Sequence, residues 1–131
     1  MKQYEDWTPA DYMIQHKKMW NWVADQTIKR KQKVTKDEYF KRKNIKKIYI
    51  PENCCYACEV AAMSAIKNNV SHLKMCDYCP INWDTKMLKT KGDRKCIQSI
   101  YNEWLTEKNW RRCAELARTI ANMPLIKTAL H

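Results

Sequence analysis

The sequence predicts a mostly α-helical fold: four or five helices around a central loop of paired cysteines, with one short β-hairpin at most. Three observations support this fold. Apolar residues recur at steps of three and four in several segments, which is the repeat of one helix face. A single glycine, Gly92, argues against the many tight turns of a β-rich fold and excludes glycine-rich phosphate loops. Finally, two Cys-x-x-Cys pairs near the middle of the chain predict an irregular, cysteine-rich loop between the helices.

The first helix is expected from Thr8 to about Lys31. Thr8 is a typical N-cap residue, and Pro9 follows it at the first helical position. Its apolar face comprises Met13, His16, Trp20, Val23 and Thr27.

A second, shorter helix is expected to begin at Thr35, where Thr35 and Glu38 have the spacing of a capping box, and to end near Asn44. The weak alternation of Ile45 to Ile50 then predicts a short strand.

Three further helices are expected in the rest of the chain. The segment from Glu59 to Asn68 has helical composition, and Asp93 begins another helix. The stripe on that helix comprises Ile97, Ile100, Tyr101, Trp104 and Leu105. The last helix begins near Asn109 and ends before Pro124. Its buried face comprises Trp110, Cys113, Ala114, Ala117, Ile120 and Ala121.

The composition predicts one globular domain rather than a disordered or membrane chain. The chain has 131 residues, of which 45% are hydrophobic and 30% are charged, and it contains no evident linker. We therefore expect a single helical domain over residues 1–131. The first residues lack the apolar segment of a signal peptide, and no apolar stretch is long enough to span a membrane. These features predict an intracellular protein.

The cysteine spacing predicts a metal site. Cys55 and Cys58 form one pair, Cys76 and Cys79 form another, and 17 residues separate the pairs. This spacing is typical of a structural zinc site, in which four thiolates surround one Zn²⁺ as a tetrahedron. We expect one structural zinc ion bound by these four cysteines, so that the central loop is a zinc-knuckle loop within a zinc-stabilised domain.

Alternatives to this ligand set remain open at this stage. Cys54, His72 or Cys96 could replace one of the four predicted ligands. The cysteines could instead be inert core residues, although polar residues flank both pairs. A thioredoxin-like redox motif would need one such pair at a helix start, not two. Cys113 lies on an apolar helical stripe and is expected in the core.

The sequence predicts no enzymatic activity. Four sulfur ligands would close the zinc tetrahedron and leave no position for water or substrate. A zinc-stabilised HNH nuclease would need a histidine base and further ligands, but His72 is the only histidine between the two cysteine pairs. A nucleotide deaminase would need a His-x-Glu motif, which the chain lacks.

The charge predicts a polyanionic or acidic partner. The chain has 25 Lys and Arg against 14 Asp and Glu, a formal net charge of +11, which one zinc bound by four thiolates would lower to about +9. Trp7, Trp22 and Trp83 fit the apolar stripes poorly, so they could be base-stacking platforms or interface anchors. The candidate partner-binding residues are Lys29, Arg30, Lys41, Arg42, Arg111 and Arg112.

Several short segments together resemble small proteins of phages and prophages of Gram-positive bacteria. They are Trp20–Trp22, Glu38–Phe40, Glu52–Glu59, Cys76–Pro80 and Ala114–Arg118, and the resemblance covers roughly residues 12 to 124. The size and the predicted zinc also look like a zinc-containing type II-A anti-CRISPR protein, a Cas9 inhibitor. The resemblance implies cytoplasmic action in the bacterial host cell, no catalytic residues, and Cys55, Cys58, Cys76 and Cys79 as metal ligands.

Two functions follow as expectations. The first is a non-enzymatic, phage-encoded inhibitor that binds a host defence protein, with Cas9 as the suspected target. Its positive charge opposes DNA mimicry, because a DNA mimic needs an acidic surface to occupy the Arg-lined cleft that reads the PAM. The alternative is a zinc-stabilised, basic nucleic-acid-binding phage regulator. The sequence shows no helix-turn-helix or ribonucleoprotein motif that would favour the alternative.

Overall fold

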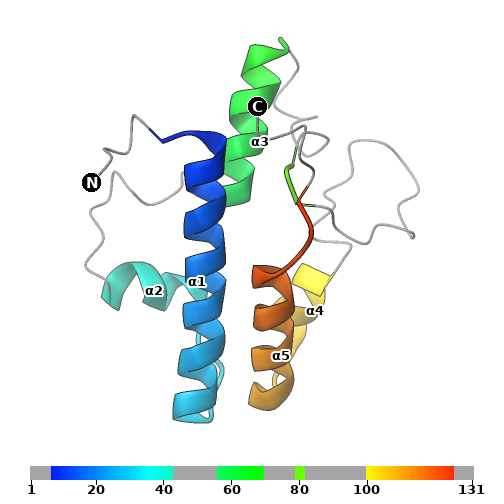
Figure 1. The fold of residues 1–131 in the computed structure, drawn as a ribbon. Helices are drawn as coiled ribbons and strands as arrows, with labels where there is room; N and C mark the ends of the chain where they lie inside the picture. The colour runs from blue at the N-terminus through cyan, green and yellow to red at the C-terminus, as the bar shows by residue number, and fades with distance from the viewer. Residues whose placement is uncertain (1–6, 43–55, 70–78, 82–99, 126–131) are drawn as a thin grey trace.

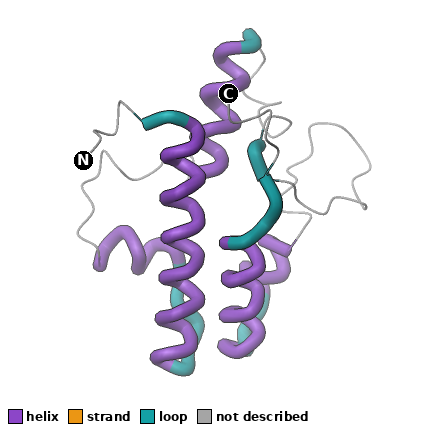
Figure 2. Tube along the Cα trace, in the orientation of Figure 1, coloured by secondary structure: helices purple, strands orange, loops and turns teal. Residues whose placement is uncertain are grey.

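The computed structural model describes residues 7–42, 56–69, 79–81 and 100–125 (Figure 1). These ranges contain five α-helices and no sheet, so the mostly α-helical prediction is confirmed for this part of the chain. The described part of the chain consists of helices and loops (Figure 2), and an isolated antiparallel bridge joins Ile81 to Leu125. No helix in the described ranges is long and apolar enough to cross a membrane. The helices are α1 (Pro9–Arg30), α2 (Lys36–Arg42), α3 (Tyr56–Lys67), α4 (Ile100–Thr106) and α5 (Trp110–Ala121).

The long helix α1 begins and ends where its sequence signals predict. The Thr8 hydroxyl accepts a hydrogen bond from the Asp11 amide at 3.2 Å, and the Asp11 carboxylate accepts one from the Thr8 amide at 2.8 Å. This reciprocal capping box satisfies amides that would otherwise lack a helical partner. Lys31, in the left-handed conformation with φ 55°, ends the helix. All five residues of the predicted apolar face are buried.

Helix α5 lies beside α1 and runs in the opposite direction (Figure 1). Its predicted start is confirmed, because the Asn109 side chain accepts hydrogen bonds from the amides of Arg111 and Arg112. The predicted buried face is confirmed except at Trp110, which is only partly buried. Leu116, which the sequence analysis did not assign to that face, is buried.

The short helix α4 packs on α5 and places two aromatic side chains, Tyr101 and Trp104, against Trp20 of α1. The indole ring of Trp104 meets that of Trp20 edge to face, with 4.7 Å between centroids. Leu105 was predicted to share the buried stripe, but it is 46% exposed, so that assignment was wrong. Because α4 has only seven residues and turns Trp104 inward, the next residue, about 100° further around the helix, points away from the core.

A single lysine holds the C-terminal end of α4. The Nζ atom of Lys33 donates hydrogen bonds to the carbonyl oxygens of Trp104, Leu105 and Glu107 at 2.6, 3.1 and 3.0 Å. The same ammonium group lies 4.8 Å from the centroid of the Trp104 ring. These carbonyls have no partner within the helix, so one cation satisfies a helix terminus and complements its negative end.

Helix α3 begins at Tyr56, three residues earlier than the predicted start at Glu59. The reason is burial: Tyr56 and Ala57 are almost fully buried in the core, and α3 packs against α1. For α2, the helix begins at Lys36, directly after the expected Thr35. The predicted end near Asn44, the strand at Ile45–Ile50 and the helix start at Asp93 lie outside the described residues.

We predict that Lys33→Met destabilises the domain by about 1–3 kcal/mol, because three carbonyl groups lose a charged donor while the apolar stem is retained. Chemical denaturation followed by tryptophan fluorescence would measure the change. Lys108→Met, at an exposed position in the connection between α4 and α5, is the matched control and should change the stability little. Equal stability of the two variants would contradict the capping role.

Candidate functional site

Two of the four predicted zinc ligands lie in the described part of the chain. Cys58 is half-buried in α3, and Cys79 is buried beside Pro80. Cys55 and Cys76 lie outside the described residues, as do the alternative ligands Cys54, His72 and Cys96. Among the described residues, no group of three or more His, Cys, Asp or Glu side chains could hold a metal ion. The four-cysteine site therefore stays a prediction.

The position of Cys58 is chemically suited to a thiolate ligand. It is the third residue of α3, and Cys55 immediately precedes the helix in sequence. The first turn of a helix has backbone amides without helical partners and carries a partial positive charge. Both effects stabilise a thiolate, so the first knuckle has its second sulfur in an environment that favours the metal-binding form.

The second cysteine of the second pair packs in the same core as the first residues of α3. Cys79 and Ile81 belong to the hydrophobic core cluster that contains Tyr56 and Ala57. The bridge between Ile81 and Leu125 also joins this segment to the chain that follows α5. Cys79 therefore packs in the same core as Tyr56 and Ala57, the two residues that precede Cys58.

Cys113 is a core residue, as predicted. Its side chain is fully buried in α5, and its Sγ atom donates a hydrogen bond to the Glu107 carbonyl oxygen at 3.3 Å. Burial raises the pKa of this thiol, although the nearby Lys33 acts in the opposite direction. At neutral pH the group is therefore a protonated thiol, which is the form that does not bind zinc.

The predicted partner-binding residues fall into two groups. Lys29, Lys41 and Arg111 are exposed, and the Arg111 guanidinium lies 5.1 Å from the centroid of the Trp110 ring. Arg30 and Arg112 instead form ion pairs within the chain. Arg42 is the last residue of α2, and its side chain is not among those described.

The two paired arginines contact carboxylates of neighbouring elements. Arg30 pairs with Glu38 of α2 at 3.3 Å. Arg112 pairs with Glu103 of α4 at 3.3 Å and with Glu115 at 3.1 Å. Because their charges are already compensated, these two arginines contribute less to the field outside the molecule than the exposed lysines do.

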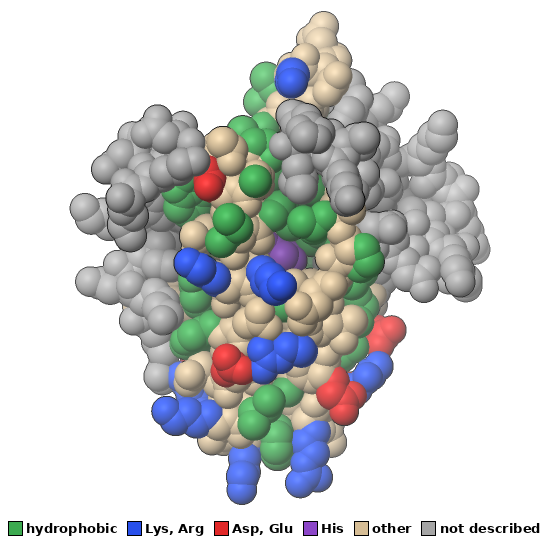
Figure 3. All heavy atoms as spheres, viewed as in Figure 1, with side chains coloured by type: hydrophobic (Ala, Val, Ile, Leu, Met, Phe, Trp, Pro, Cys, Tyr) green, Lys and Arg blue, Asp and Glu red, His purple; other side chains and the backbone are tan. Residues whose placement is uncertain are grey.

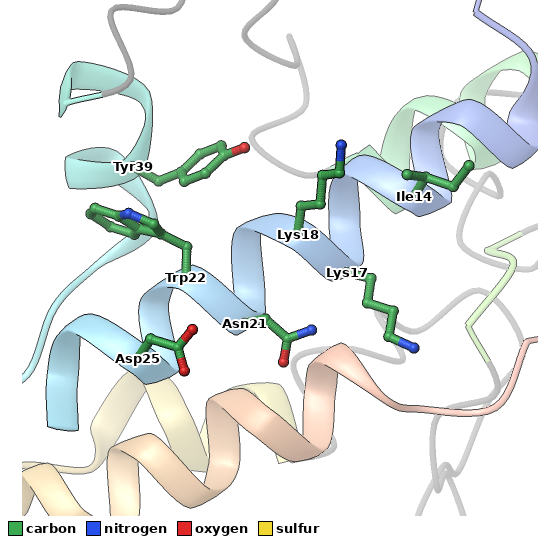
Figure 4. Close-up of a pocket in the computed structure, with 7 residues that line it drawn as sticks. All are labelled: Ile14, Lys17, Lys18, Asn21, Trp22, Asp25 and Tyr39. Carbon is green, nitrogen blue, oxygen red and sulfur yellow. The ribbon is translucent and has the colours of Figure 1, made fainter. Parts of the chain in front are cut away.

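The structure also has a shallow groove on α1, which the sequence did not predict. It has a volume of about 550 Å³ and a mostly apolar lining. Two rows of side chains spaced four residues apart along α1 form its sides, and Tyr39 of α2 closes one edge (Figure 4). One row is Ile14, Lys18 and Trp22, and the other is Lys17, Asn21 and Asp25.

The α5 side of this groove is fixed by Arg118. Its guanidinium donates a hydrogen bond to Asn21 Oδ1 at 2.7 Å and forms an ion pair with Asp25. This arrangement compensates Asp25, the one carboxylate among the described residues that line the groove. It also leaves the Asn21 amide nitrogen directed along α1, on the side of Lys17 (Figure 4).

The α2 side of the groove is aromatic. The rings of Trp22 and Tyr39 meet edge to face, with 5.5 Å between centroids. Trp22 is partly buried, as is Trp7, whereas Trp83 lies outside the described residues. Burial raises the pKa of the Tyr39 hydroxyl, so this group remains a neutral hydrogen-bond donor at physiological pH.

An aromatic chain connects the groove to the start of α3. Tyr39 contacts Phe40, whose ring lies 6.0 Å from that of Tyr56. Tyr56 in turn contacts Trp7 and Tyr12. The groove edge and Tyr56, which directly follows the first cysteine of the first knuckle, are therefore parts of one packed cluster.

Comparison of the chain with protein-family models, curated proteins and solved structures returns no match.

We predict that the purified protein contains about one equivalent of zinc, and that Cys58→Ser or Cys79→Ser removes it and lowers soluble yield. Elemental analysis of protein purified without chelators would measure the zinc. Cys113→Ala is the matched control: it should keep the metal, although it loses buried packing. Less than about half an equivalent of zinc in the unmodified protein would contradict the site.

Proposed function

We propose that this chain is a zinc-stabilised, non-enzymatic binding protein of a phage that inhibits a host defence protein by docking a basic surface on an acidic partner. The observation that carries this proposal is how the charges are distributed over α1 and α2. Residues 7–41 contain eight basic and four acidic residues. Three of the four acidic residues are engaged within the chain: Asp11 in the helix cap, Asp25 with Arg118 and Glu38 with Arg30.

Five lysines of the same region are left for a partner, whereas Lys33 and Lys36 form hydrogen bonds within the chain. Lys17, Lys18, Lys29, Lys31 and Lys41 are exposed, and none forms an ion pair within the described part of the chain. In the space-filling view, Lys and Arg side chains are spread over the face of α1 and α5, with hydrophobic side chains between them (Figure 3). Such a surface attracts acidic groups and speeds their encounter.

The sequence resemblance makes Cas9 the first target to test. A positively charged protein would be repelled from the positively charged DNA channel of Cas9, so mimicry of DNA is disfavoured. We therefore propose docking on an acidic protein patch away from that channel, or on the phosphates of the guide RNA. Inhibition would then come from blocking a rearrangement or the loading of target DNA.

We predict that the protein binds Cas9 with an association rate that falls as the salt concentration rises. Replacing Lys29, Lys41 and Arg111 together by Glu should slow association by about tenfold or more, and replacing them by Gln should give an intermediate rate. Biolayer interferometry with Cas9, with and without guide RNA, would measure these rates, and a DNA-cleavage assay would measure inhibition.

The nucleic-acid alternative predicts a different result. Tight binding to generic DNA or RNA that weakens steeply between about 50 and 300 mM salt, without binding to Cas9, would favour a phage regulator over the inhibitor. Zinc content should be unchanged in the Glu and Gln variants, because these positions are not metal ligands. Failure to bind Cas9 in both states would contradict this target.

A further inference from the structure

We propose that the groove between the two rows of α1 is the docking site for an acidic amphipathic helix of the partner, whose apolar side chains enter the groove while its carboxylates meet Lys17 and Lys18. This inference rests on the proposed function in requiring an acidic protein partner. It adds the place of docking, the kind of partner element and two residues that the sequence analysis did not select.

The shape of the groove fits a helix. Packed helices insert the side-chain ridge of one into the groove between ridges of the other, and the two rows on α1 form such a groove. From Ile14 to Asp25 the groove extends over eleven residue steps, about 16 Å at 1.5 Å per residue. A partner helix of about three turns would cover that length.

The chemistry of the lining selects acidic and aliphatic side chains. Ile14 is 53% exposed at one end, and Trp22 offers a partly buried indole further along. Lys18 rises from the α2 side and Lys17 points toward the α5 side, so cations flank the apolar floor on both sides (Figure 4). The Asn21 amide nitrogen adds a neutral donor, while Arg118 compensates Asp25.

The same lining fits a nucleic acid less well. Tyr39 is only 7% exposed, and its ring packs against Trp22, so it offers no open face for a base. Among the described residues, the groove is lined by two lysines and no arginine, which provides few contacts for phosphates. Its mostly apolar lining is instead typical of a helix-binding groove that uses apolar anchors.

The contacts around the groove also make it preorganised. Arg118 holds the Asn21 and Asp25 row against α5, and the edge-to-face contact with Tyr39 holds Trp22 against α2. A partner would therefore not have to order these side chains on binding, which lowers the entropic cost of association.

The test uses the full zinc-loaded protein and a capped peptide of about twelve residues that contains only Glu and Leu, with Leu at helical spacing. The peptide has no tryptophan, so binding is read from the protein's own tryptophan fluorescence. We expect saturable binding that Lys17→Glu with Lys18→Glu weakens about tenfold or more. The pair Lys67→Glu with Lys108→Glu makes the same change in charge at exposed positions outside the groove and should leave peptide affinity within about threefold.

Two further controls locate the site and the class of ligand. Trp22→Phe should remove most of the fluorescence change while peptide binding persists in calorimetry. Phenylalanine keeps an aromatic ring in the groove but lacks the indole that gives the fluorescence signal. A peptide with Lys in place of Glu should not bind. Three outcomes would overturn the inference. They are no binding of the Glu–Leu peptide, an equal loss of peptide affinity in both charge-reversal pairs, and preferential binding of single-stranded oligothymidylate. Peptide binding without Cas9 binding would keep the groove and reject the Cas9 target.

Discussion

Antiparallel packing of α1 against α5 is the interaction on which the other helices depend. The buried face of α1 meets the buried face of α5, and His16 Nε2 lies 3.4 Å from the Ile120 carbonyl oxygen across this contact. Helices α2 and α3 pack on α1, while α4 packs on α5 and places Trp104 against Trp20. Burial of these apolar faces is the main stabilising contribution within the described residues.

The aromatic chain from Tyr39 to Tyr56 relates the predicted metal site to the groove. Tyr56 lies between Cys55 and Cys58 in sequence, and its ring supports Phe40, which in turn contacts Tyr39 at the groove edge. A closely packed interior transmits displacement, because its side chains have few voids into which they can relax. The start of α3 and the edge of the groove therefore belong to one packed cluster, so the predicted metal ligation of Cys58 would act on the same cluster that supports Trp22.

Helices with strong caps and a regular apolar repeat could be predicted with their starts and buried faces, whereas the predicted start of α3 was three residues too late and the predicted buried face of α4 wrongly included Leu105. Thr8 and Asn109 marked the starts of α1 and α5, and the repeat from Met13 to Thr27 identified the buried face of α1. Leu105 was misplaced because periodicity cannot show how much of a short helix its neighbours cover. The groove escaped prediction because it depends on α2 and α5 flanking α1, and on Arg118 reaching Asn21 and Asp25 from nearly a hundred positions away. The cysteine spacing predicted a metal site, for which the described residues provide the positions of Cys58 and Cys79.

Sequence separation gives the α1–α5 contact a consequence for biosynthesis. His16 and Ile120 are 104 positions apart, so the apolar face of α1 is synthesised long before the face that covers it. At about 5–20 residues per second, the delay is roughly five to twenty seconds, far longer than a helix needs to form. During that interval Trp20 and Val23 lack their final neighbours from α4 and α5, which makes the nascent chain prone to aggregation or chaperone binding. Closing so long a loop also slows folding, so the first and last helices of the described chain set the pace at which the domain is completed.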